Sequence, residues 1–277
     1  MTVNGRRSVG AMRSRHRIIA DFHYELGPIV SGYNGRTLHV SVGTGEIRGK
    51  PVSEEMKTKF IGGKGFDLRL LWDEVNPQTR WDSPENAICI SSGPLGGTTT
   101  YSGAGKSLVT TISPTTGIVI DSNVGGYFGP LLKFSGWDAL VVSGISEQEV
   151  IVVIDATSGE VRIETAPDEA VDSHVLAEQL TRMFGETPND FENVSVVSAG
   201  TGAEHSLIGC LNFSWWDWRR GHVRLKQAGR GGIGTVLRRK RIKAFVVHAK
   251  PWRNLWTITV GQASTGGGRR LGEERHG

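Results

Sequence analysis

The chain has 277 residues, and its formal net charge of +4 resides in its two ends, because residues 33–250 sum to −1. A basic face for nucleic acid is therefore not expected in the central part. The only two cysteines, Cys89 and Cys210, lie in apolar runs where buried thiols are expected, and no Cys-x-x-Cys is present to ligate zinc or an iron–sulfur cluster. No apolar stretch reaches the roughly 18–20 residues of a membrane span, and no apolar signal segment follows the N-terminal arginines, which predicts a cytoplasmic location.

The first third of the chain predicts one hairpin and two helices. Residues 1–32 show no clear period and are expected to be disordered or to come from a misassigned start. Order is expected from residue 33, with a hairpin over 36–49. Ser53 is expected to cap a helix over the next seven residues, and a second helix should cover 66–75.

The rest of the ordered region predicts short strands interrupted by two helices. A helix near 127–134 should end at Gly136, and Asp172 should cap a helix over 173–184 that Gly185 ends. Strands are expected at 87–92, 107–113, 118–121, 138–143, 194–198, 207–213 and 244–249, with a hairpin over 149–164. About a dozen short strands and four or five helices, with many hairpins, favour the α+β class. Residues 250–277 lack a sustained period and are expected to be a disordered or non-native tail.

Two Gly-rich segments repeat along the chain. SNVGGYFG (122–129) and QAGRGGIG (227–234) align on their double glycines with an offset of 106 residues, and each precedes a helix-like stretch and a strand. Upstream, ICISSGPLG and VSVVSAGTG are offset by 107 residues. The sequence thus predicts a β-rich domain of two related halves, each with a strand, a Gly-rich turn, a helix and a strand. Such turns bind anions through free N–H groups, although tight packing alone also explains glycines.

Two other segments leave alternatives open. GAGKS (103–107) lacks the first glycine of a nucleotide phosphate loop and precedes a strand-like run, so only a turn that brings Lys106 to an anion stays open. WWDWRRGHVR (215–224) could stack on a ligand, bind RNA or line a domain interface.

The ordered string GPLGGT, SNVGGYFG, LLKFSGWDALVVSG and AGRGGIG resembles the N-terminal domain of the aldehyde:ferredoxin oxidoreductase family over about residues 33–249. The resemblance implies a domain that forms the base beneath a tungsten (or molybdenum) bis-pyranopterin cofactor. It also accounts for the repeat, because each Gly-rich turn would receive one pterin phosphate, with Mg²⁺ bridging the two.

By motif position, the resemblance implies two sets of cofactor-binding residues, one for each turn. The first set is Lys106, Asn123 and Gly125, and the second is Lys226, Gln227, Gly229 and Arg230. The backbone carbonyls of Asn123 and Gln227 are the implied Mg²⁺ ligands. Lysine stands at 106 and 226 where family members are expected to have arginine, which keeps the charge and loses the bidentate geometry.

The resemblance further implies oxidation of aldehydes to carboxylic acids with a ferredoxin-type acceptor, electron-transfer partner subunits, and a homodimer or hetero-oligomer. No catalytic residue is implied in this chain: the family's 4Fe-4S cysteines and acid–base residues lie in later helical domains. The chain is therefore expected to be truncated and inactive alone. The alternatives are a related aromatic acyl-thioester reductase subunit, a non-catalytic anion- or nucleotide-binding module, and a fragment without activity.

Overall fold

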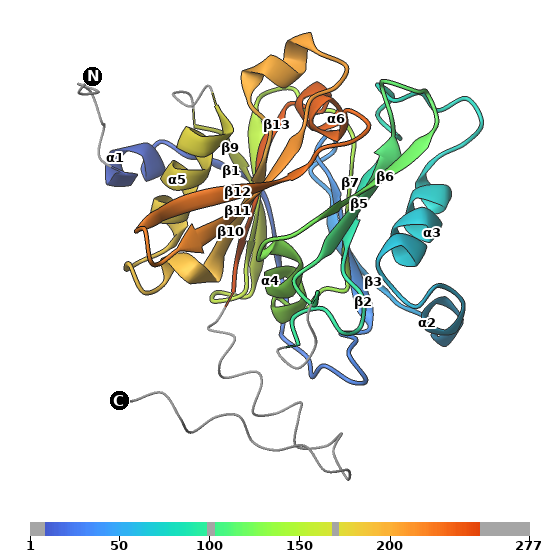
Figure 1. Cartoon of the computed structure of the whole chain (residues 1–277), viewed down its shortest axis with the longest axis horizontal. Coiled ribbons are helices and arrows are strands. Elements are labelled where there is room, and N and C mark those ends of the chain that lie inside the picture. Colours follow the sequence, from blue (N-terminus) through green and yellow to red (C-terminus); the bar gives the residue numbers. More distant parts are fainter. Residues whose placement is uncertain (1–8, 99–102, 168–171, 250–277) are drawn as a thin grey trace.

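The computed structural model describes residues 9–98, 103–167 and 172–249. Two β-sheets face each other, with helices between them and on both outer faces (Figure 1). The six-stranded sheet has the order β3 (Ile47–Pro51), β2 (Arg36–Ser41), β7 (Ala139–Ser143), β4 (Ile88–Ser91), β5 (Ser107–Ile112), β6 (Val119–Val124). The seven-stranded sheet has the order β1 (Ile18–His23), β9 (Glu160–Thr165), β8 (Val150–Asp155), β13 (Ile242–His248), β10 (Val194–Ser198), β11 (Leu211–Asp217), β12 (His222–Ala228).

The two sheets share one topology once β1 is set aside. In each, a hairpin (β2–β3 or β8–β9) is followed by helical structure, three antiparallel strands, a short helix and a last strand that returns to the middle. That last strand is parallel to the first strand of the hairpin, β7 to β2 and β13 to β8, while all other neighbours in the two sheets are antiparallel. The predicted α+β domain of two related halves is confirmed, with 13 strands and six α-helices in the described residues.

The helices between the sheets are the two that follow the Gly-rich turns, α4 (Phe128–Phe134) and α6 (Ile233–Arg239). Both contact strands of both sheets, and the main hydrophobic core combines residues of the two sheets with residues of these helices. Phe128 of α4 meets Phe213 of β11 edge to face, with ring centroids 5.6 Å apart. The outer faces are covered separately, the six-stranded sheet by α2 (Glu54–Phe60) and α3 (Lys64–Glu74) and the seven-stranded sheet by α5 (Ser173–Phe184).

Both predicted helix caps are confirmed. The Ser53 hydroxyl accepts a hydrogen bond from the backbone N–H of Met56 at 3.1 Å, which fixes the start of α2. Asp172 accepts the N–H groups of His174 and Val175, each at 2.8 Å, at the start of α5. Both caps satisfy N–H groups that the first turn of a helix leaves without a partner.

The segment before residue 33 has regular structure in its described part, which differs from the expectation of disorder. Residues 9–13 form α1 (Val9–Arg13), and β1 pairs antiparallel with β9. Alternate residues of β1, Ala20 and Phe22, pack against the main core. This strand could not be expected from the local sequence because its partner strand β9, and the Glu164 carboxylate that binds the preceding helix α1, lie far along the chain. The fully buried Glu164 carboxylate accepts Arg13 at 2.5 and 3.1 Å. Residues 250–277, expected to be a tail, lie outside the described residues.

The tryptophan-rich segment belongs to a hairpin that the sequence analysis did not predict. β11 extends to Asp217, beyond the predicted strand end at 213, and β12 follows after a short turn. Trp216 is buried and packs edge to face on Phe191 at 4.9 Å, whereas Trp218 is 69% exposed. The expectation that both thiols are buried was wrong for one of them, since Cys89 is buried and Cys210 is exposed.

Buried cations occupy equivalent positions in the two inner helices. Lys133 near the end of α4 is 3% exposed, and burial lowers its pKa to about 8, opposed by the nearby Asp138 carboxylate. Arg238 near the end of α6 is 6% exposed and donates to Glu204 at 2.9 Å. The Lys133 ammonium donates to the backbone carbonyls of Gly32, Gly93 and Pro94. Each cation thus ties its helix to loops of the surrounding structure.

Stability should depend on pH through His248, at the end of β13. Its Nε2 lies 3.0 Å from Asp190 and its Nδ1 3.4 Å from Asp155. Burial alone would lower the pKa of His248, but these carboxylates raise it above its ordinary value. The ion pairs therefore stabilise the fold fully below the unfolded-state pKa of about 6.5, and this stabilisation is lost as pH rises through the folded-state pKa. Urea unfolding at several pH values should show a decline above neutrality that His248→Gln reduces. An identical decline in the variant would contradict this assignment.

Candidate functional site

The two Gly-rich turns join equivalent elements in the two halves. Residues 125–127 connect β6 to α4, and residues 229–232 connect β12 to α6, so the second turn is one residue longer. β6 and β12 are the last strands of their sheets, and they contact each other. The two turns therefore lie near the junction between β6, at the edge of one sheet, and β12, at the edge of the other. Neither Gly-rich segment alone indicates this placement.

Each turn packs against the opposite half of the domain. A Cβ atom on Gly126 would lie 3.7 Å from the carbonyl oxygen of Ser214 in β11, and one on Gly231 would lie 2.6 Å from Ile120 in β6. The rings of Tyr127 and Trp215 lie 6.0 Å apart across the same junction. Each half of the domain therefore helps to position the turn of the other half.

The backbone N–H groups of the two turns have no partner among the described residues, and all of these residues except the buried Gly232 are at least partly exposed. Within the described part of the chain, no acceptor takes a hydrogen bond from the N–H groups of residues 125–127 or 229–232. Successive free N–H groups in a turn create a positive concavity that favours anions such as phosphate. The repeat of this arrangement supplies two such places, one in each half of the domain.

The structure puts Asn123 and Gln227 at equivalent positions. Asn123 of β6 lies opposite Leu108, and Gln227 of β12 lies opposite Asn212. Both members of the second pair are 104 residues after those of the first, so the two strand pairs have the same register. Both residues are exposed and stand two positions before their turns. The Gln227 amide lies 3.4 Å from the Asn212 amide oxygen.

The two lysines of the predicted set do not form an equivalent pair. Lys106 precedes β5, and its Nζ lies 4.0 Å from a Cβ built on Gly125, so it stands beside the first turn. Lys226 lies within β12 opposite Phe213, in the register position that Ser122 holds in the first half. The position equivalent to Lys106 is occupied by Cys210, so the two halves present different charges.

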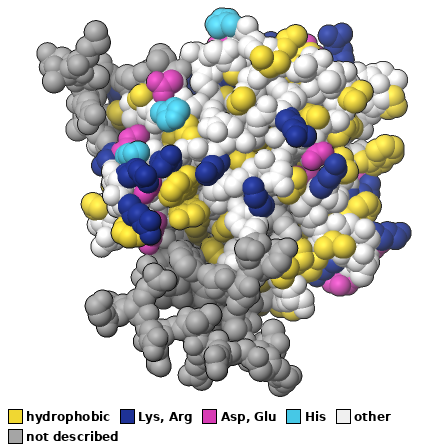
Figure 2. Space-filling view, viewed as in Figure 1, with side chains coloured by type: hydrophobic (Ala, Val, Ile, Leu, Met, Phe, Trp, Pro, Cys, Tyr) yellow, Lys and Arg dark blue, Asp and Glu magenta, His cyan; other side chains and the backbone are white. Residues whose placement is uncertain are grey.

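The charges near the turns are not neutralised by the chain itself. Lys106, Lys226 and Arg230 are exposed, and none of them forms an ion pair with another described residue. Figure 2 shows Lys and Arg side chains across the middle of the face over β12. Gly229 has no atom within 4 Å of the place where a side chain would begin, so a ligand can approach its backbone. Free N–H groups, uncompensated cations and open backbone fit a ligand with two anionic groups.

The described residues contain neither a metal-ligand cluster nor a membrane-spanning helix. No group of three or more His, Cys, Asp or Glu side chains in 9–98, 103–167 and 172–249 is arranged to hold a metal ion. No helix in the same ranges is both long enough and apolar enough to cross a membrane.

These features define a two-fold repeated α+β domain with two equivalent Gly-rich turns. The family described as "Aldehyde ferredoxin oxidoreductase, N-terminal domain" matches residues 37–249. The tungsten-containing aldehyde ferredoxin oxidoreductase of Pyrococcus horikoshii is 35% identical over 216 residues, which is 78% of this chain and 33% of that protein. The chain therefore belongs to the aldehyde ferredoxin oxidoreductase family, as the sequence motifs predict.

Two further proteins are similar over the same region. The aliphatic sulfonate oxidoreductase, WOR-like subunit, of Pyrococcus furiosus is 26% identical over 227 residues, covering 77% of this chain and 34% of that protein. A solved structure of the active-site complex BamBC of benzoyl coenzyme A reductase, with 1,5-dienoyl-CoA, aligns with a TM-score of 0.67 and 26% identity, covering 79% of this chain and 31% of that one. The chain spans about one third of the length of the curated relatives it matches.

Proposed function

We propose that this chain is the cofactor-binding N-terminal domain of a tungsten (or molybdenum) bis-pyranopterin oxidoreductase that oxidises aldehydes to carboxylic acids. The observation that carries the proposal is the pair of equivalent turns, at 125–127 and 229–232, whose N–H groups have no hydrogen-bond acceptor within the described residues and are exposed or half-buried at 125–127 and 229–231. The tungsten-containing relatives support this choice of ligand. A cofactor with two pterins carries two phosphates, one for each turn.

The bound cofactor would supply the redox-active metal, while the residues of this chain bind and orient it. Lys106 and Arg230 would neutralise phosphate charge beside the first and second turn, and Lys226 would add a cation from β12. Gly125 and Gly229 would let the phosphates approach the backbone closely, since neither position is crowded. Charge-assisted hydrogen bonds of this kind are about twice as strong as neutral ones.

Asn123 and Gln227 would provide backbone carbonyls to a Mg²⁺ ion between the phosphates. Their equivalent register next to the two turns supports this assignment. Carbonyl oxygens are suitable ligands for Mg²⁺, which often binds together with substrate phosphates. The 4Fe-4S cluster and the acid–base residues would belong to other domains, and electrons would leave through a ferredoxin or an electron-transfer subunit in the cytoplasm.

Replacing Arg230 by alanine in the full-length protein should reduce cofactor retention. Arg230 is exposed and has no ion-pair partner among the described residues, so its loss should leave the fold intact. Losing a charge-assisted contact should weaken cofactor binding on the order of tenfold to a hundredfold. Tungsten and molybdenum content after gel filtration measures this. Arg239→Ala, an exposed arginine at the other end of α6, is the matched control. Equal metal content in both variants would count against the phosphate site.

A second candidate function is reduction of an aromatic acyl thioester. The similarity to the benzoyl coenzyme A reductase complex favours it, because 26% identity accompanies a TM-score of 0.67. Anaerobic assays of the full-length protein with aldehydes and with aryl-CoA substrates would separate the two reactions. A protein that binds nucleotide and no metal would instead support the non-catalytic binding module.

A further inference from the structure

The β11–β12 hairpin ends in a tip, residues 218–221, that lies away from the second Gly-rich turn (Figure 1). β12 begins at His222, directly after the tip, and ends at Ala228, directly before the turn at 229–232. At about 3.3 Å per strand residue, the length of β12 separates the tip from the turn by roughly 20 Å. The hairpin tip is therefore a surface distinct from the proposed cofactor site.

Hydrogen bonds within the hairpin fix the shape of its tip. The backbone carbonyl of Asp217 accepts the N–H groups of Arg220 and Gly221 at 3.1 and 2.8 Å. The Asp217 carboxylate accepts the backbone N–H of Arg219 at 3.2 Å and the Arg220 guanidinium at 2.8 Å. A tip that is ordered before binding loses little conformational freedom when a partner binds, which favours its use in recognition.

Two side chains of the hairpin tip form an exposed aromatic–cation pair. Trp218 is 69% exposed, and the central guanidinium carbon of Arg219 lies 5.1 Å from the centroid of its indole ring. Arg219 is exposed and forms no ion pair with another residue in 9–98, 103–167 or 172–249. Stacking on a ring leaves the edge of a guanidinium free to donate to a carboxylate. Trp and Arg are also among the residue types that contribute most at protein interfaces.

The arginines near the tip outnumber the carboxylates of the hairpin. Arg220 and Arg224, both exposed, share the carboxylate of Asp217 at 2.8 and 3.5 Å. Lys226 follows two residues later, on the same face of β12 as Arg224, and is also exposed. Figure 2 shows Lys and Arg side chains gathered around this end of the hairpin, at the left of the view, with hydrophobic and acidic side chains between them.

The elements that pack against the hairpin do not remove this surplus. Glu178 of α5 pairs with Arg182 at 2.5 Å, so its charge is already offset. Glu192 lies in η1 (Phe191–Asn193), which contacts β11, and forms no ion pair with another described residue. Four exposed cations of the hairpin, the three arginines and Lys226, therefore meet two carboxylates, and the hairpin keeps a positive potential.

We propose that the hairpin tip is a docking surface for an acidic segment of a partner protein. A carboxylate of the segment would accept the Arg219 guanidinium, a second would lie beside Arg220, and an apolar side chain would cover the Trp218 ring. A protein fits this surface better than a nucleic acid does, because residues 33–250 sum to −1 and offer no extended basic face to a phosphate backbone. Docking here does not depend on the proposed cofactor function, since the second Gly-rich turn lies at the other end of β12.

Fluorescence anisotropy of a short labelled peptide tests the proposal on the 277-residue chain. The peptide contains alternating Glu and Asp with one central Leu, and it should bind with a dissociation constant on the order of 100 µM at low salt. Binding should weaken as the salt concentration rises, because exposed charges are screened. A peptide of the same length with Gln and Asn in place of the acids should bind at least about tenfold more weakly.

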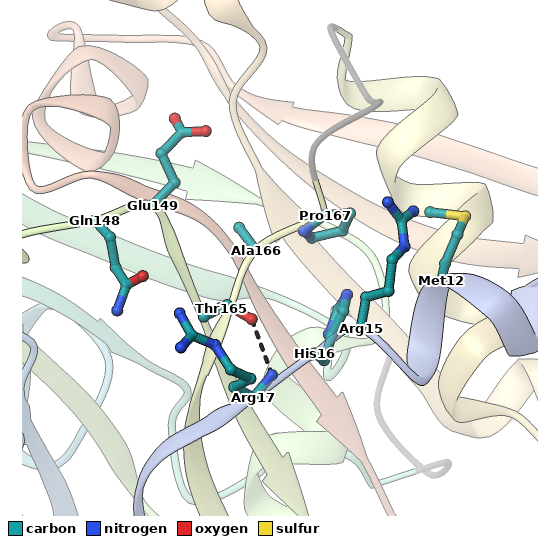
Figure 3. A pocket seen from close by; sticks show the side chains of 9 residues that line it. All are labelled: Met12, Arg15, His16, Arg17, Gln148, Glu149, Thr165, Ala166 and Pro167. Atoms are coloured by element: carbon teal, nitrogen blue, oxygen red, sulfur yellow. Dashed lines mark hydrogen bonds between the residues drawn. The ribbon is translucent and has the colours of Figure 1, made fainter.

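Arg219→Gln and Trp218→Ser should each weaken binding of the acidic peptide about fivefold to tenfold. Arg17→Gln is the control for net charge, since its side chain is also exposed and lies just before β1, at the opposite edge of the same sheet (Figure 3). Trp72→Ser is the control for loss of an exposed indole, because Trp72 is 75% exposed on α3, which covers the other sheet. Both controls should keep the affinity of the parent chain.

Four results would overturn the docking surface. Absence of saturable binding would show that the tip recognises no acidic segment. An equal loss in Arg17→Gln and Arg219→Gln would assign the binding to net charge alone. Tighter binding of single-stranded oligothymidylate than of the peptide would make the tip a nucleic-acid site. Binding that is present in the 277-residue chain and lost in the full-length protein would mean that another domain of the same protein covers Trp218.

Discussion

Replacing Gly232 by alanine is expected to destabilise the domain by about 3 kcal/mol or more. Gly232 has a φ of +67°, and an added Cβ would lie 2.1 Å from the carbonyl oxygen of Leu207 and 2.6 Å from Pro114. Neither neighbour is the end of a flexible side chain, so the turn would have to move away from the loop before β11 in its own half and from Pro114 in the other half. Urea unfolding monitored by tryptophan fluorescence measures the change. Near-parent stability would show that the junction between the halves is more adaptable than this packing implies.

Gly229→Ala in the same turn is the matched control. No atom lies within 4 Å of a Cβ built at this position, and its φ is not in the left-handed region. Its effect on stability should stay within about 0.5 kcal/mol. In the full-length protein the same methyl group should lower metal content if a phosphate approaches this backbone. Comparing Gly232→Ala with Gly229→Ala thus distinguishes the position in the turn that stabilises the fold from the position proposed to bind the cofactor.

The repeat and most elements of the fold could be predicted because they depend on local patterns. Ser53 and Asp172 are N-cap residues that predict the helices after them, and the glycines of the turns predict where β6 and β12 end. The elements that were missed depend on distant partners. β1 is held by β9, about 140 residues away, and β12 buries Val223 and packs Leu225 in the cluster that contains α5, while most of its other residues are exposed.

The candidate site could be predicted in part for the same reason. Motif position indicated Asn123 and Gln227, and the strand register puts them at equivalent places. The register also shows that Lys106 corresponds to Cys210 and Lys226 to Ser122, which an alignment on the double glycines could not reveal. The double glycine occupies the first two positions of the first turn and the last two positions of the second, so an alignment on the glycines is shifted by two residues from the strand register. The assignment of these residues to a cofactor stays a prediction.

Expressed without further domains, the 277-residue chain is expected to show no aldehyde-oxidising turnover and to retain little tungsten. Cys89 is buried in β4 of one sheet, and Cys210 is exposed beside β11 of the other. These two thiols cannot form the four-thiolate cage that an iron–sulfur cluster usually requires. The proposed cofactor face is also open, since Lys106, Gln227 and Arg230 are exposed, so water would compete for every phosphate contact.

Anaerobic purification with tungstate present, followed by metal and iron analysis and an assay with a low-potential dye, checks this expectation. The full-length protein that contains this domain, prepared in the same way, is the control and should hold both metal and iron. Stoichiometric tungsten together with turnover in the 277-residue chain would contradict the prediction, because electrons would then leave the cofactor without a cluster. Tungsten without turnover would locate the cofactor on this domain and the path for electrons outside it.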